Sequence, residues 1–279
     1  MARTRFSGMR SVRMWIVLIV MSVLGVLVLN SASAIVPGKR FDSTGSYIIV
    51  GVLFFALMRF LRVSTLRYFS KPALGWRFVV AIVLCANLTY VQLKGEPFHT
   101  MRISQWLSGI TFLLVVGFTE EVLSRGVIFG VLQRRGLPIA VIGSSLMFGL
   151  MHLNVYIGNW DPWQAYWHVM SAASFGVFAC ALLVVTKSMW VPIIFHSLSD
   201  AGLLFETPPT KEEEAYRVSI DFWQGATHPL SVFLTFVIPA LILFWIHAGT
   251  PVPHWFMRYA IKFGLVDDKV VEQVSDSTV

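Results

Sequence analysis

Long apolar runs alternate with short polar loops along the whole chain. About 20 consecutive apolar residues are needed for an α-helix to cross the hydrocarbon core of a bilayer, and each run approaches that length. Lipid offers backbone groups no hydrogen-bond partner outside the helix itself, which favours helices throughout. The pattern therefore predicts an all-α fold, a polytopic transmembrane helical bundle of about eight spans. The expected spans are residues 14–36, 46–61, 77–93, 106–133, 137–157, 166–186, 189–205 and 230–248.

The placement of lysine and arginine predicts how these helices are oriented, because cytoplasmic loops carry an excess of both. Twelve basic residues lie in or beside alternate loops, and only six lie on the opposite side, which also carries the acidic run 212–214. We therefore expect both termini to be cytoplasmic. The twelve are Arg3, Arg5, Arg10, Arg13, Arg59, Arg62, Arg67, Lys71, Arg77, Arg134, Arg135 and Lys187.

The N-terminal segment admits two interpretations. A basic start, an apolar core at 15–29 and the small residues at 32–34 resemble a secretory signal peptide, whose removal would leave seven spans. The charge distribution is consistent with retention, so we expect residues 1–34 to be kept and the run at 14–36 to be a true first helix. We expect a single membrane-embedded domain over residues 1–279, with its motif-bearing core at 106–205 and a cytoplasmic tail at 249–279.

Composition narrows the class of protein further. Hydrophobic residues make up 56% of the chain and charged residues 13%, whereas soluble domains are near 45–50% and about 25%. This excludes a soluble enzyme, a disordered chain and a nucleic-acid binder, although the net charge is +7. Cys85 and Cys180 both lie in apolar runs, so the chain has neither a disulfide framework nor a cysteine-type metal spacing.

A few ionisable residues interrupt the apolar runs. Insertion scales assign each acid or base at a helix centre a cost of roughly 2.5–3.5 kcal/mol, so such groups usually face the bundle interior and mark a functional site. They are Glu120, Glu121 and Arg125 in the fourth run, His152 in the fifth, and His196 and Asp200 in the seventh.

Spacing indicates which of these groups can meet. Glu121 and Arg125 are four residues apart, so they share a helix face and can form an ion pair. Glu120 is turned about 100° away from that face. His196 and Asp200 also stand four apart, so the carboxylate can orient the imidazole. We interpret the remaining histidines as structural: His99, His168, His228, His247 and His254.

The chemistry open to this set is restricted. Burial raises the pKa of a carboxyl group, which suits a carboxylate of this set as a general base near neutral pH. One imidazole can share the activation of water, and another can donate to the oxyanion that develops on a carbonyl. Peptide-bond hydrolysis by activated water fits these groups. Glu120, His152 and His196 could equally hold Zn²⁺ as a catalytic site with an open position.

Three motifs in order carry a resemblance to a known family. Residues 120–125 read E-E-x-x-x-R, residues 148–152 read F-x-x-x-H, and residues 196–200 read H-x-x-x-D. This set resembles the CPBP family of CAAX prenyl endopeptidases and bacteriocin-processing enzymes, also called ABI or Rce1-type glutamate intramembrane proteases. The resemblance covers about residues 120–200, under a third of the chain.

The resemblance implies roles for the individual residues. Glu120 would be the general base that activates water, and His152 its partner. His196 would stabilise the oxyanion, while Glu121 and Arg125 would support the geometry of the first motif.

Asp200 departs from the family pattern, in which asparagine is frequent at this position. A carboxylate cannot donate to an oxyanion unless it is protonated, so we expect Asp200 to orient His196. The departure also makes a metal-bound variant easier to envisage, so zinc stays an option although no cofactor is required.

The leading hypothesis is an intramembrane endopeptidase in a prokaryotic cell membrane, acting on a membrane-associated peptide or protein and on no nucleic acid. The substrate would be a prenylated CAAX tail or a peptide leader or sorting segment. One alternative is a proton- or ion-coupled transporter, which also uses intramembrane acids and histidines, although the chain shows neither repeat halves nor paired broken helices. A second alternative is a non-catalytic immunity or scaffold protein of the membrane.

Overall fold

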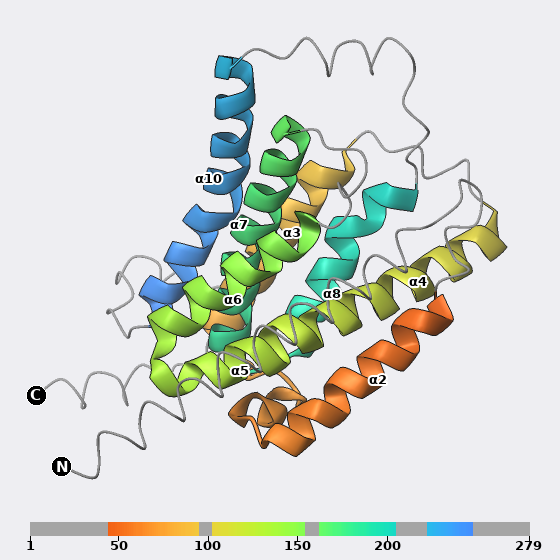
Figure 1. Cartoon of the computed structure of the whole chain (residues 1–279), viewed down its shortest axis with the longest axis vertical. Coiled ribbons are helices and arrows are strands. Elements are labelled where there is room, and N and C mark those ends of the chain that lie inside the picture. The colour runs from red at the N-terminus through yellow and green to blue at the C-terminus, as the bar shows by residue number, and fades with distance from the viewer. Residues whose placement is uncertain (1–43, 95–101, 154–161, 205–221, 248–279) are drawn as a thin grey trace, which may run out of the picture.

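The computed structural model describes residues 44–94, 102–153, 162–204 and 222–247, and this part of the chain is entirely helical (Figure 1). Seven of the eight expected spans lie wholly or largely within it, and each contains a helix, whereas residues 154–157, 205 and 248 of these spans lie outside the described residues. The first expected span and the tail lie outside the described residues. The helices are α2 (Thr44–Leu61), α3 (Trp76–Leu93), α4 (Ile103–Glu121), α5 (Phe129–Leu132), α6 (Leu137–Met151), α7 (Pro162–Thr186), α8 (Trp190–Ser199) and α10 (Phe222–His247).

Some spans differ in detail from the expected continuous helices. The fourth is α-helical in α4 and α5, but a π-helical segment (Val122–Ile128) joins the two. The seventh continues from α8 as a 3₁₀ helix (Asp200–Leu204). Helix α7 begins at Pro162, four residues before the expected start, because proline fits the first turn of a helix, where its missing N–H needs no partner.

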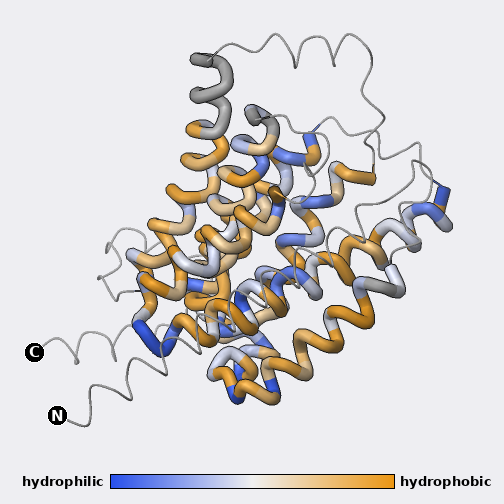
Figure 2. Tube along the Cα trace, in the orientation of Figure 1, coloured by the Kyte–Doolittle hydropathy of each residue, from blue (hydrophilic) through white to orange (hydrophobic). Residues whose placement is uncertain are grey.

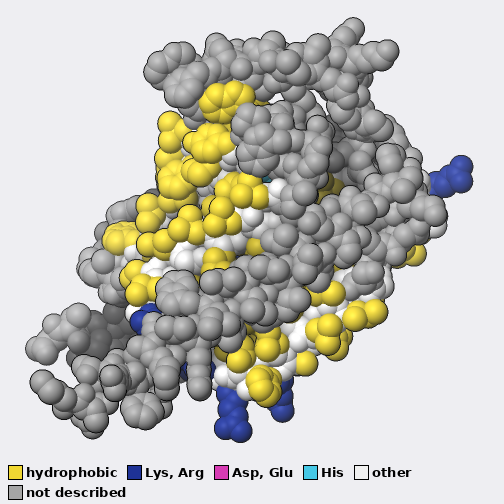
Figure 3. Space-filling model, viewed as in Figure 1, with side chains coloured by type: hydrophobic (Ala, Val, Ile, Leu, Met, Phe, Trp, Pro, Cys, Tyr) yellow, Lys and Arg dark blue, Asp and Glu magenta, His cyan; other side chains and the backbone are white. Residues whose placement is uncertain are grey.

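Three helical segments are long and apolar enough to cross a membrane: Trp76–Leu93, Ala165–Thr186 and Leu230–His247. Three shorter segments are also apolar: Tyr47–Leu61, Leu137–Met151 and Trp190–Leu204. Hydrophobic residues run along α2 and α10 (Figure 2), and hydrophobic side chains cover the outside of both in the view of Figure 3. Such an apolar exterior suits an integral membrane protein. The count of eight spans and the side on which the termini lie stay predictions.

The loops predicted to be cytoplasmic meet at one end of the bundle. The Ala73 N–H donates to the carbonyl of Thr186 at 2.8 Å, and the Met189 N–H donates to the carbonyl of Tyr68 at 2.8 Å. These bonds join the loop after α2 to the loop after α7. The loop between α5 and α6 belongs to the same end, because Arg134 donates to the carbonyl that ends α2 at 3.2 Å. Within the described part of the chain, the basic residues of these three loops therefore lie at one end.

Helix α7 forms the centre of the packing. Phe178, Leu182 and Leu183 on this helix have no solvent exposure. Helix α6 lies so close to α7 that a Cβ atom at Gly149 would stand 2.6 Å from the carbonyl oxygen of Val169. Small residues are the usual means by which membrane helices approach this closely. The close contact places the end of α6, which carries the second motif, firmly against the core.

We expect replacement of Gly149 by valine to force α6 and α7 apart, because the added side chain would meet backbone atoms that cannot rotate away. Overpacking of this kind costs about 1–3 kcal/mol. The matched control is Gly45→Val, since nothing lies within 4 Å of a Cβ at that position. Thermal midpoints of the purified proteins in detergent check the prediction, and equal midpoints for the two variants would contradict it.

Candidate active site

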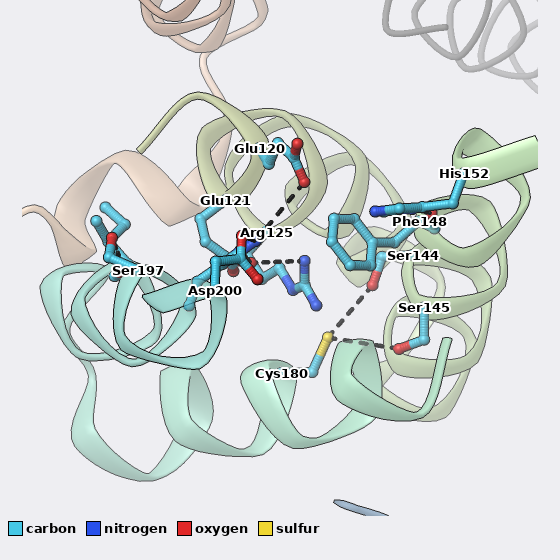
Figure 4. A network of polar contacts seen from close by, with 12 residues as sticks. Glu120, Glu121, Arg125, Ser144, Ser145, Phe148, His152, Cys180, Ser197 and Asp200 are labelled. Atoms are coloured by element: carbon cyan, nitrogen blue, oxygen red, sulfur yellow. Dashed lines mark hydrogen bonds and ion pairs between the residues drawn. The ribbon is translucent and has the colours of Figure 1, made fainter. Parts of the chain in front are cut away.

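A buried ion pair lies at the centre of the candidate site. Glu121 ends α4, and its Oε1 accepts a hydrogen bond of 2.9 Å from Nη1 of Arg125, with neither side chain exposed to solvent. The pair that the four-residue spacing predicts is therefore present. The guanidinium also lies 4.5 Å above the ring of Phe148, a cation–π contact with α6 (Figure 4). The first motif is thus attached to the second through Arg125 and Phe148.

The π-helical segment sets the geometry just after the two glutamates. At its end the Phe129 N–H donates to the carbonyl of Ser124, five residues earlier, instead of four as in an α-helix. The carbonyl of Gly126 accepts a 2.6 Å hydrogen bond from the Thr65 hydroxyl, which comes from the loop after α2. Single π-turns within α-helices are frequent at functional sites. Here the turn lies between Glu121 and α5 and carries Arg125 inward.

His196 on α8 connects the ion pair to two further carboxylates. Its Nδ1 lies 2.8 Å from Oε1 of Glu121. Its Nε2 lies 3.3 Å from Oδ2 of Asp200 and 3.7 Å from Oε2 of Glu120. An imidazole with carboxylates at both nitrogens donates to both only in its doubly protonated form. The Glu121 contact fixes the plane of the ring and directs Nε2 toward Glu120 and Asp200.

His152 comes from the end of α6 and joins the site through an aromatic ring. Its Nδ1 lies 2.8 Å from the carbonyl oxygen of Phe148. A neutral imidazole that donates from Nδ1 keeps Nε2 as the nitrogen that can accept a proton. The ring centroid of Phe148 is 4.8 Å from that of His152 and 5.8 Å from that of His196. The Phe148 ring thus lies between the two imidazoles.

The structure brings all six candidate residues to one region. Five of them are linked by the contacts just described, and the sixth, His152, joins through Phe148. The exposed fraction of the side chains rises from 0% at Arg125 through 10% at Glu120 to 31% at Asp200. The site therefore lies deepest at the ion pair and is most accessible beside Asp200.

The candidate zinc ligands do not form a metal cluster. Among the described residues, no three His, Cys, Asp or Glu side chains are arranged so that they could hold a metal ion. Glu120, His152 and His196 share a region, but they do not make a donor set in this arrangement.

Two further polar residues border the site. His168 on α7, which we expect to be structural, packs its ring against His152 with 4.8 Å between centroids. Tyr47 on α2 is buried beside α4, where its carbonyl accepts a 2.9 Å hydrogen bond from Thr119, the neighbour of Glu120. Neither belongs to a motif. In the sequence, each is only a ring with a polar tip in an otherwise apolar run. Many aromatic residues at membrane interfaces have the same property, so it does not identify a site residue.

Loss of Arg125 should destabilise the protein, because Glu121 would remain buried without its partner. Breaking a buried pair in this way costs about 3–5 kcal/mol. Arg125→Met should therefore lower the thermal midpoint in detergent strongly, and adding Glu121→Gln should recover part of the loss by removing the unpaired charge. Additive losses in the double variant would contradict this account.

The chain matches one known family over part of its length. Residues 102–202 match the family model of type II CAAX prenyl endopeptidases, Rce1-like. The matched segment begins at the N-terminal end of α4 and includes all three motifs. No curated protein and no solved structure matches the chain. Residues 102–202 carry the whole candidate site, and their match supports a relation of the chain to the CPBP/Rce1-type family, a family of proteases.

Proposed function

We propose that this protein is an intramembrane endopeptidase that hydrolyses a peptide bond of a membrane-associated peptide or protein. The observation that carries the proposal is the convergence of one acid, Glu120, and two imidazoles, His152 and His196, from three helices of the segment that matches a protease family. An acid and neighbouring imidazoles can take a proton from water and return it, so they can activate water as a nucleophile without a covalent intermediate.

Glu120 is the general base of the proposed reaction. Its carboxylate takes a proton from water while the water oxygen forms a bond to the scissile carbonyl carbon. When the tetrahedral intermediate collapses, the C–N bond breaks and Glu120 returns the proton to the leaving amine. His152 supports the same water through Nε2, because its Nδ1 faces the Phe148 carbonyl.

His196 stabilises the charge that develops on the carbonyl oxygen. Its Nδ1 is held by Glu121, so Nε2 is the nitrogen available to the substrate. A donor that is fixed before the reaction needs no reorganisation in the transition state, which makes it effective. Asp200, at 3.3 Å from Nε2, orients the imidazole and balances its positive charge when it is doubly protonated.

The family supports a substrate with a membrane anchor. The matched model describes CAAX prenyl endopeptidases, so a C-terminal prenylated tail is the first substrate to test. A leader or sorting segment is the second. The partial exposure of Asp200 supports entry of either peptide from that side of the site.

Replacement of Glu120 by glutamine should abolish cleavage, since the amide keeps the shape of the side chain but cannot accept the proton. The matched control on the same helix is Thr111→Val, because the Thr111 hydroxyl is exposed and bonds only one turn back, to the carbonyl of Leu107 at 2.7 Å. Purified protein in nanodiscs is given prenylated CAAX peptides, the same peptides without the prenyl group, and anchored leader peptides, and products are identified by mass spectrometry.

Full activity of Glu120→Gln would disprove the glutamate-centred mechanism. A parallel series with a chelator tests metal dependence, and loss of wild-type cleavage there would move the mechanism to a metal site. Cleavage of the leader peptides alone would reassign the substrate and keep the reaction.

Replacement of His152 by glutamine should lower kcat about 10²–10⁴-fold, the usual contribution of a general acid–base group. His247→Gln is the matched control, because His247 ends α10 at the end of the bundle that carries the basic loops. Steady-state kinetics on the peptide that the wild type cleaves check this. Similar rates for the two variants would show that His152 has no part in catalysis.

A further inference from the structure

Helix α2 carries a tyrosine into the neighbourhood of the catalytic glutamate. The helix packs very closely on α4, since a Cβ atom at Gly51 would lie 2.7 Å from the hydroxyl oxygen of Thr119. One turn earlier, the Tyr47 carbonyl accepts a 2.9 Å hydrogen bond from the same hydroxyl. Because Thr119 precedes Glu120 in α4, this bond fixes the backbone of Tyr47 beside the site.

The ring of Tyr47 lies on the face of α4 that carries Glu120. It packs edge-on against Phe112, with 6.0 Å between centroids and 89° between planes, and it also packs with Val116. Phe112, Val116 and Glu120 follow one another at intervals of four residues, so they form one stripe along the helix. The residue is only 7% exposed. The tyrosine therefore covers the stripe next to the catalytic carboxylate.

Two carboxylates of the accessible half of the site, Glu120 and Asp200, act electrostatically on the hydroxyl of Tyr47. Glu120 lies on α4 and Asp200 begins the 3₁₀ helix after α8, so charges from two elements of the site act on the phenol. A substrate carbonyl placed for attack by the water at Glu120 would lie beside the stripe of α4 that Tyr47 covers.

The proposed reaction needs hydrogen-bond donors at this place, and the motif residues supply few. Nδ1 of His196 is occupied by Glu121, which leaves one N–H. An ionised Asp200 offers only acceptors, whereas a phenol offers an O–H. Buried tyrosine hydroxyls normally find a hydrogen-bond partner. A carbonyl oxygen of the substrate would serve as that partner.

We propose that Tyr47 is a further catalytic residue, whose hydroxyl donates a hydrogen bond to the scissile carbonyl oxygen as this oxygen becomes negatively charged. It supplies the donor that a carboxylate at position 200 cannot provide. The phenolic proton stays on Tyr47 throughout, so no bond of the residue is broken. This inference rests on the proposed endopeptidase function.

Tyr47→Phe is the direct test, because it removes the hydroxyl and keeps the ring that packs on Phe112. Removal of one oxyanion donor costs about 10²–10³-fold in kcat, and KM should change little because the bond strengthens only in the transition state. Tyr68→Phe is the matched control, since its hydroxyl accepts a 3.1 Å hydrogen bond from Arg67 at the end that carries the basic loops. Thermal midpoints confirm that both variants are folded.

A rescue experiment separates donation from packing. Asparagine at position 200 can donate where aspartate cannot, so adding Asp200→Asn to Tyr47→Phe should raise kcat at least tenfold over the single Tyr47→Phe variant. In the wild-type background, where Tyr47 already supplies the donor and Asp200 orients His196, Asp200→Asn should not raise kcat. Equal effects in the two backgrounds would overturn the proposal, as would a Tyr47→Phe variant with the wild-type kcat.

The placement of the hydroxyl can be measured without a substrate. With 3-fluorotyrosine at position 47, the ¹⁹F resonance should move when Glu120→Gln or Asp200→Asn removes a neighbouring charge, and an unmoved resonance in both would overturn the proposal.

Loss of cleavage in Glu120→Gln together with full activity in Tyr47→Phe would disprove this role alone. A wild-type protein that cleaves none of the peptides would overturn the proposed function, and the role of Tyr47 with it.

Discussion

The buried pair of Glu121 and Arg125 is the constraint on which the rest of the site depends. Two charges without solvent exposure are tolerated only if they compensate each other, because the desolvation of each ion costs several kcal/mol. The pair in turn holds His196 through Nδ1 and Phe148 through the guanidinium face, so one interaction positions groups on three helices. The same pairing leaves Glu120 as the acid whose carboxylate remains available for proton transfer.

Much of this arrangement can be predicted from the sequence because helical spacing is a local property. The apolar runs predicted the helices, and the interval of four residues predicted the contacts of Glu121 with Arg125 and of His196 with Asp200. The π-helical segment could not be predicted in this way. Its carbonyl at Gly126 is bonded by Thr65, a residue about 60 positions earlier in the chain. The periodicity of apolar residues contains no information about such a distant contact.

Residues that reach the site only through the packing of helices could not be predicted from the sequence either. Tyr47 approaches because Gly51 lets α2 lie against α4, and His168 approaches because Gly149 lets α6 lie against α7. A small residue is a weak signal by itself, since it shows that a close contact is allowed and not which helix makes it. The motifs identify the polar residues of three helices, whereas the close helix contacts decide which residues of α2 and α7 face them.

In the proposed mechanism, the two adjacent glutamates of α4 have different roles, one structural and one reactive. Glu121 is wholly buried and has short contacts to Arg125 and His196, at 2.9 and 2.8 Å, so its carboxylate is held in place. Glu120 is turned about 100° from it. It faces the imidazole of His196 at 3.7 Å, in the half of the site where exposure increases toward Asp200. A carboxylate with fewer fixed partners can exchange a proton with water, which the proposed role of Glu120 as general base requires.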